Sequence, residues 1–264
     1  MNNNQEFFSL LEEIKEQELH PIQLTSRQPI KIKQLTALHL KDLVESVVDS
    51  PVTQSLFSST INKILKTSVS TETPVDYNTL NYIDKVIFAV NTRINSLSPT
   101  LKVTEDKEQF EIDLNEIKKR LSSLVNQNPT LFHEQTITSD SCNITYGIPL
   151  IFVEDQINSE INKIKSDKQA ETPEQLRKML GEAFINEIAK TIKTIEIKGK
   201  NIDLATIQFK TRIQMVESLP ASLLSNVIRF IESYKKQLDE CLTMQKPDGQ
   251  PYTVNIDGSL FTMY

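Results

Sequence analysis

The clearest hydrophobic pattern in this sequence lies between Leu80 and Ser96. Apolar residues recur there every three or four positions, and at 100° per residue they fall on one stripe of a helix. The members of the stripe are Leu80, Ile83, Val86, Ile87, Val90, Ile94 and Leu97. Asp84 and Arg93 fall at its opposite edges, nine residues apart, so they cannot pair with each other. The pattern predicts a helix whose two charges have partners elsewhere, in this chain or in another one.

Alternation of apolar and polar residues predicts several β-hairpins. Ile22 and Leu24 alternate with polar residues, a turn follows at 26–29, and Ile30 and Ile32 alternate again. Similar strand patterns occupy residues 101–104, 110–112, 131–138, 143–153 and 252–256. The last of these follows a tight turn at Asp248-Gly249, so we expect a hairpin near the end of the chain.

Helical spacing dominates the rest of the sequence. Thr36 is placed to cap one helix, and Pro173 stands at a favoured first-turn position of another, which is expected to continue through Ile192. Further helices are predicted at 7–17, 52–66, 115–126 and 154–165, and two more meet at Leu219-Pro220. The expected fold class is α+β, predominantly α-helical with short antiparallel β-hairpins. We expect three consecutive parts, namely a hairpin-plus-helices lobe at 1–100, a mixed segment at 101–166 and a helical lobe with a terminal hairpin at 172–264.

Composition narrows the classes of function. The chain has 264 residues, of which 38% are hydrophobic and 24% charged, as expected for a folded protein. Its five glycines never cluster, so no phosphate-cradling loop is present. The net charge is −6, and short basic groups such as 118–120 have acidic residues close by, which is typical of solvated helix faces. We therefore expect no nucleic-acid partner.

Candidate chemistry is sparse. The two cysteines and three histidines do not have the spacing of a zinc site, so we expect no metal and no cofactor. A pair of carboxylates acting as general acid and base stays open, but most carboxylates of such a chain lie on solvated helix faces. No nucleophile motif occurs, and we expect the protein not to be an enzyme. Apolar runs such as 148–153 are too short to span a bilayer, and the N-terminal residues lack a secretory signal.

Two interpretations of the singled-out charges stay open. Asp84 near the start of its helix and Arg93 near its end would each complement the helix dipole by about 0.3–1 kcal/mol. Alternatively, they orient the helix against a partner protein. Phe261 and Tyr264 have the same two possibilities, since they can fold back onto the last helix or anchor a contact with another protein.

Taken in order, the motifs resemble the baseplate hub protein family of T-even-type contractile-tailed phages. The resemblance is carried by Pro29–Lys33, Tyr82-Ile83-Asp84, Arg93–Ser96, Phe110–Leu114, Tyr146–Pro149, Leu219-Pro220, Asp248-Gly249 and Gly258–Phe261. It spans most of the chain, although each motif is short. Many members of that family carry paired cysteines, whereas residues 104–109 and 245–248 contain none here, so no metal site is carried over.

The resemblance implies a structural protein of the virion, built into the tail baseplate at its central hub, after synthesis in the host cytoplasm. Its implied partners are other baseplate, hub and tail-tube proteins and, in a symmetric assembly, copies of itself. The implied interface residues are Asp84, Arg93, Phe261 and Tyr264. Three alternatives stay open: a hub assembly factor or chaperone absent from the mature virion, an adaptor for a host protein, and a hydrolytic enzyme without a recognisable motif.

Overall fold

The protein folds as a mixed α+β chain that is mostly helical, as the sequence predicts. A computed structural model describes residues 19–48, 53–70, 72–105, 108–139, 142–165 and 172–261. The helix expected at 7–17 and Tyr264 lie outside these ranges. The chain forms two compact units, unit 1 being 1–77, 83–127 and 239–264, and unit 2 being 78–82 and 128–238. These units do not coincide with the three consecutive parts expected from the sequence, because unit 1 collects residues from three separate stretches.

Among the described residues, four α-helices belong wholly or mainly to unit 1. They are α2 (Ala37–Val48), α3 (Thr53–Ser68), α4 (Tyr82–Ser96) and α5 (Leu114–Gln127). Thr36 caps α2 as predicted, since its Oγ1 accepts the backbone N–H of His39 at 3.3 Å. Helix α4 is buried on every side from Ile83 to Arg93. The predicted single stripe is therefore too narrow a description of α4, which is a core helix.

The strands of unit 1 form three antiparallel hairpins, each of which the sequence predicts at least in part. They are β1 (His20–Gln23) with β2 (Pro29–Ile32), β3 (Thr100–Glu105) with β4 (Glu108–Asp113), and β9 (Thr243–Gln245) with β10 (Pro251–Thr253). The outer edge of β2 is covered by the chain that follows α3. The N–H of Lys33 donates to the carbonyl of Ser68 at 2.8 Å, and the N–H of Ser70 donates to the carbonyl of Lys31 at 2.9 Å.

Unit 2 is built around one antiparallel sheet of the order β5-β6-β7-β8. Its strands are β5 (Gln135–Thr138), β6 (Cys142–Tyr146), β7 (Ile192–Ile197) and β8 (Lys200–Asp203). The register places one isoleucine of each strand in a single row across the sheet: Ile137, Ile144, Ile195 and Ile202. The two central members, Ile144 and Ile195, are fully buried. This row is the apolar centre of the sheet.

Two strand predictions and one helix prediction need correction in unit 2. Residues 129–132 form a short 3₁₀ helix, η2 (Pro129–Phe132), because a proline at its start favours a helical turn over a strand. The strand predicted at 143–153 ends at Tyr146, and helix α6 (Ile151–Lys165) begins after Pro149. The helix expected to run through Ile192 ends at Thr191, where the β-branched sequence Ile-Lys-Thr-Ile enters β7.

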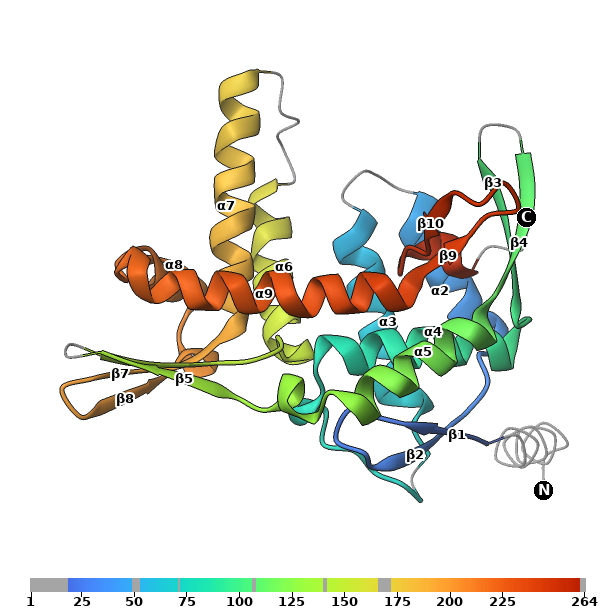
Figure 1. The fold of residues 1–264 in the computed structure, drawn as a ribbon, viewed down its shortest axis with the longest axis horizontal. Helices are drawn as coiled ribbons and strands as arrows, with labels where there is room; N and C mark the ends of the chain where they lie inside the picture. The colour runs from blue at the N-terminus through green and yellow to red at the C-terminus, as the bar shows by residue number, and fades with distance from the viewer. Residues whose placement is uncertain are drawn as a thin grey trace, which may run out of the picture. The chain divides into compact units, whose positions relative to one another are not determined.

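The helices of unit 2 are α6, α7 (Pro173–Thr191), α8 (Phe209–Glu217) and α9 (Ala221–Leu242), whose last turn belongs to unit 1. Figure 1 shows α6 and α7 side by side. Helix α7 begins with a capping box, in which Thr172 Oγ1 accepts the N–H of Gln175 and the Gln175 side chain accepts the N–H of Thr172. Within the described residues, no helix combines the length and the apolar character needed to cross a bilayer.

Candidate functional site

Asp84 lies at the start of α4 and binds the β1–β2 turn of the same unit. Its two carboxylate oxygens accept the backbone N–H of Thr25 at 2.7 Å and the Thr25 hydroxyl at 3.1 Å. Asp84 is 2% exposed, so this pair is inside the protein. The next residue, Lys85, is also buried and donates its Nζ to Ser58 Oγ at 2.9 Å. Both charges at the start of α4 therefore contact elements of this chain.

Arg93 lies at the other end of α4 and binds three backbone carbonyls. Its Nε donates to Leu260 at 2.8 Å, Nη1 to Ser98 at 2.6 Å and Nη2 to Thr100 at 3.3 Å. Burial lowers the pKa of this guanidinium, which is 3% exposed. An arginine offers several N–H donors in a fixed planar fork, and here the fork joins the end of α4 to the start of β3 and to the C-terminal 3₁₀ helix η4 (Gly258–Phe261).

Phe261 follows the carbonyl that Arg93 binds and is itself buried. Its ring lies 6.1 Å from that of Phe57 in α3, measured between centroids, with the ring planes tilted by 41°. The structure thus brings Arg93 and Phe261 together at η4, while Asp84 lies near the other end of α4. Tyr264, the fourth predicted interface residue, lies outside the described residues.

Asp84, Arg93 and Phe261, which the sequence predicts as interface residues, all have partners within this chain. In the folded chain their side chains are buried and their partners are supplied by unit 1 itself. These internal partners have a simple physical cause. A buried charge needs compensating hydrogen bonds, and the chain supplies these from segments that are far away in sequence. We therefore assign these three residues to holding unit 1 together.

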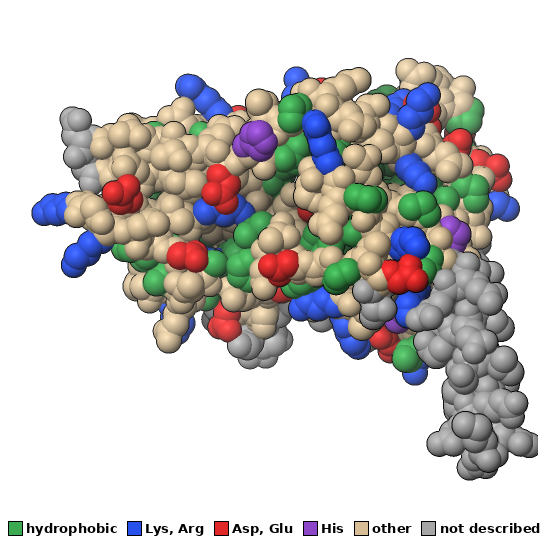
Figure 2. All heavy atoms as spheres, turned by 90° about the horizontal axis from the view of Figure 1, so that it is seen from below, with side chains coloured by type: hydrophobic (Ala, Val, Ile, Leu, Met, Phe, Trp, Pro, Cys, Tyr) green, Lys and Arg blue, Asp and Glu red, His purple; other side chains and the backbone are tan. Residues whose placement is uncertain are grey.

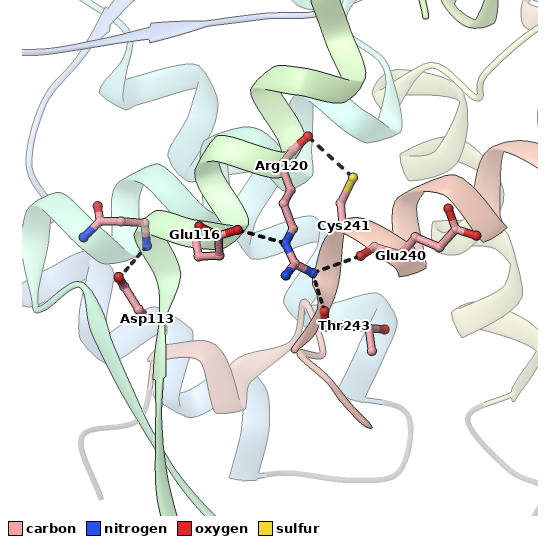
Figure 3. Close-up of polar contacts among 7 residues, drawn as sticks. Asp113, Glu116, Arg120, Glu240, Cys241 and Thr243 are labelled. Atoms are coloured by element: carbon pink, nitrogen blue, oxygen red, sulfur yellow. Dashed lines mark hydrogen bonds and ion pairs between the residues drawn. The ribbon is translucent and has the colours of Figure 1, made fainter. Parts of the chain in front are cut away.

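Arg120 is a residue whose role the sequence did not reveal. Its basic neighbourhood predicts a solvated face, but the structure places it against the end of α9, as Figure 3 shows. Arg120 Nη1 donates to the carbonyls of Thr243 at 2.7 Å and Glu240 at 3.5 Å, and Nε contacts Glu116 at 3.3 Å. The thiol of Cys241 in turn donates to the carbonyl of Arg120 at 3.7 Å. A cation at the last carbonyls of a helix is favourable because those carbonyls have no partners within the helix.

Two basic residues of unit 2, Lys193 and Arg212, are candidate catalytic residues by their lowered pKa. Burial lowers the pKa of Lys193 to about 8, against the opposing effect of Glu134, so a fraction of this amine is neutral near neutral pH. Its Nζ, however, donates to the carbonyl of Ile148 at 2.8 Å. The buried Arg212 likewise donates to the carbonyl of Leu204. Both contacts join segments of unit 2, and neither presents an acid and a base in the arrangement that proton transfer needs.

Glu187 in the C-terminal part of α7 forms a second charged group. Its two carboxylate oxygens contact Lys190 at 3.0 Å and Lys235 of α9 at 2.8 Å. Burial alone would raise the pKa of Glu187, but the charges of both lysines outweigh it and lower the pKa to about 2. The carboxylate is therefore ionised at neutral pH and links α7 to α9. This group also serves the packing of unit 2.

Helix α7 carries two of the four exposed large apolar side chains among the described residues, the others being Leu38 of α2 and Ile197 of β7. Leu180 is 62% exposed and Phe184 is 50% exposed, and both lie on one face because they are four residues apart. Lys178 and Glu182 form an ion pair at 4.0 Å on the opposite side of the helix. An added Cβ at Gly181 would have no atom within 4 Å. Leu180 and Phe184 therefore form a small exposed apolar pair on α7, opposite the Lys178–Glu182 ion pair.

The surface charge is mixed. On the face drawn in Figure 2, basic and acidic side chains are interspersed among hydrophobic ones. Among the described residues, no group of three or more histidine, cysteine, aspartate or glutamate side chains is placed to hold a metal ion. Comparisons with protein-family models, curated proteins and solved structures found no match to this chain. A functional inference must therefore come from the residues themselves.

Proposed function

We propose that the chain is a structural component of a contractile phage tail baseplate, at its central hub, and that it acts through protein–protein interfaces. The proposal draws on the resemblance between its ordered motifs and the baseplate hub family. Several motif residues have a physical task in the structure. Asp84 and Arg93 hold the two ends of α4, and the Gly258–Phe261 motif supplies the carbonyl and the ring at η4. Motifs that hold a scaffold together are the ones that relatives with a common fold are expected to share.

The single observation that carries the interface part of the proposal is the exposure of Leu180 and Phe184 on α7. Contiguous exposed apolar side chains are typical of sites where another protein binds. Large apolar anchors supply most of the binding free energy at such sites, and surrounding charges select the partner. The proposed occupant of this face is a neighbouring baseplate protein, as the family resemblance implies.

The first experiment is mass spectrometry of purified particles of the phage that encodes the chain. We expect peptides of this protein in a fixed ratio to other baseplate proteins. Peptides found in tail intermediates but missing from finished particles would replace the structural role with that of an assembly factor. Recovery with host proteins alone would overturn both.

A matched pair of variants tests the α7 face directly. Replacing Leu180 and Phe184 by serine removes the apolar anchors, and we expect at least a tenfold loss of incorporation into baseplates. The control replaces Lys178 and Glu182 by serine on the opposite side of the same turns. Equal incorporation of the two double variants would show that this face is not the interface.

A further inference from the structure

The outer edge of β5 carries backbone groups without a partner among the described residues. Strand β5 is the first in the sheet order and pairs only with β6. Beyond the strand, the N–H of Ser139 donates to the carbonyl of Cys142 at 3.0 Å. Antiparallel strands alternate the direction of their backbone groups, so Ile137 points its N–H and C=O toward β6, while Thr136 and Thr138 point theirs away from the sheet.

Strand β8 forms the opposite edge of this sheet, and it differs from β5 in its charged residues and in its hydrogen bonds to the segment that follows it. Strand β8 carries Lys200 and Asp203, and the carbonyl of Asp203 accepts the Thr206 hydroxyl at 2.8 Å. Charges and local hydrogen bonds are devices by which proteins prevent an edge strand from pairing with another chain. Strand β5 reads Gln-Thr-Ile-Thr, contains no charge and no proline, and exposes Gln135, Thr136 and Thr138. Its edge is therefore open to pairing.

The side chains on the two faces of the sheet determine which residue types an added strand needs at each position. On one face, the isoleucine row ends at the half-buried Ile137. On the other face, Thr136 contacts Thr145 across the strands, with 3.2 Å between their hydroxyl oxygens. An added strand should therefore place an apolar residue beside Ile137 and uncharged polar residues beside its two neighbours.

We propose that β5 pairs with β5 of a second copy of this chain, antiparallel, about a two-fold axis at Ile137. In this register Ile137 meets Ile137 of the second copy, and Thr136 lies opposite Thr138 of the second copy. The outward N–H and C=O groups of both threonines then form a hydrogen-bonded pair on each side of the axis, giving four new bonds. The isoleucine row continues through eight strands. Strand β5 of a second copy suits this edge because neither strand carries a charge, so no like charges are brought together when the two pair.

Analytical ultracentrifugation of the full chain tests the proposal, with Thr136→Pro as the variant. Proline removes the outward N–H and is tolerated at an edge strand whose N–H faces solvent. We expect a dimer of the wild-type chain and a dissociation constant at least tenfold higher for Thr136→Pro, since two of the four bonds are lost. Circular dichroism checks that the variant remains folded.

The matched control is Asn201→Pro on β8. Lys198 and Gly199 both have positive φ, which is the geometry of a two-residue hairpin turn, so the N–H of Asn201 points away from β7. This variant should dimerise like the wild type. A wild-type chain that stays monomeric at all concentrations, or equal weakening by both proline variants, would overturn the proposal.

A cysteine variant tests the register even if the proline variant fails to fold. Ile137→Cys places two thiols opposite each other at the axis, at a separation that a disulfide can span. Thr138→Cys is the control on the same strand, since residue 138 of one copy lies two residues along the strand from residue 138 of the other. The native Cys142 and Cys241 are buried. Covalent dimers of Ile137→Cys alone are expected under mild oxidation, and equal or absent cross-linking of both variants would contradict the register. This inference does not depend on the proposed role in a phage tail.

Discussion

Helices α4 and α7 show how differently one chain can use two helices of similar length. Helix α4 is buried on all sides over eleven residues, including its charged and polar ones. Helix α7 buries Ile188, Ala189 and Thr191 at its C-terminal end, while Leu180 and Phe184 nearer its middle are exposed. The polar groups of α4 thus contact other segments of the same chain, whereas Leu180 and Phe184 of α7 are exposed apolar side chains.

The comparison teaches that residue type alone does not identify an interface. Charges on an apolar helix attract attention because they need partners, but these partners can come from the same chain. Thr25 lies 59 positions from Asp84, and Leu260 lies 167 positions from Arg93. Exposed apolar side chains are the stronger sign of an interface, because exposing apolar surface to water is unfavourable in free energy.

The largest expected effect concerns Arg93. Replacing it by alanine leaves the carbonyl oxygens of Leu260 and Ser98 without their charged donor, and we expect the free energy of unfolding to fall by about 3 kcal/mol. Urea denaturation measures the change. The control is Arg177→Ala on exposed α7, for which the expected change is below about 0.5 kcal/mol. Similar effects of both variants would remove the distinction between the two helices.

Asp84 should show a smaller effect at the other end of α4. Asp84→Ala removes both acceptors of the Thr25 N–H and hydroxyl, and we expect a loss of about 2 kcal/mol of unfolding free energy. Asp84→Asn keeps one carbonyl oxygen and should lose about half as much. If Asp84→Ala left stability unchanged but weakened binding to another baseplate protein, the interface prediction for Asp84 would be supported instead.

Glu187 tests whether the C-terminal part of α7 is held within unit 2, in contrast to the exposed Leu180 and Phe184. Its pKa of about 2 is below the ordinary value of 4.5, so its stabilising contribution is complete above about pH 4.5 and is lost as the pH falls toward 2. Because the side chain is one-third exposed, we expect about 1–2 kcal/mol. The difference in unfolding free energy between pH 6 and pH 3 should shrink by this amount in Glu187→Gln. An unchanged difference would show that the C-terminal part of α7 is not held by this pair.

The exposed apolar pair on α7 should show the smallest effect on stability. Replacing Leu180 and Phe184 by serine removes side chains that contact little of this chain, and we expect a change within about 0.5 kcal/mol. Thermal unfolding by circular dichroism is the measurement. A loss above about 2 kcal/mol would mean that these side chains pack within the protein.

Local patterns in the sequence predicted local structure well. The alternation of Ile22, Leu24, Ile30 and Ile32 gave the first hairpin, and all four side chains are buried. Thr36 caps its helix as predicted, and Pro173 stands in the first turn of α7 as predicted. Such signals depend on neighbours along the chain, so they can be read from the sequence.

Contacts between distant segments could not be read in this way. Asn91 and Thr92 are polar residues outside the predicted apolar stripe of α4, yet both are buried, and the Asn91 side chain donates to the carbonyl of Ile87 at 2.8 Å. The pairing of β6 with β7 joins strands separated by a helical pair, and no residue spacing encodes it. The partners of Arg93 and Arg120 could not be predicted for the same reason. Both arginines bind backbone carbonyls, which every residue has, so the sequence does not single out the partner.

The bond from Arg93 to the carbonyl of Leu260 also orders events during synthesis. Unit 1 takes its final piece from residues 239–264, which leave the ribosome after all of unit 2. Domains that are continuous in sequence can fold while translation proceeds. Here Arg93 can bind the nearby carbonyls of Ser98 and Thr100 early in synthesis, but its bond to Leu260 can form only after residue 260 emerges. The end of α4 therefore depends on a segment made much later, and a variant that lacks residues 258–261 should be cleaved faster near α4 in limited proteolysis.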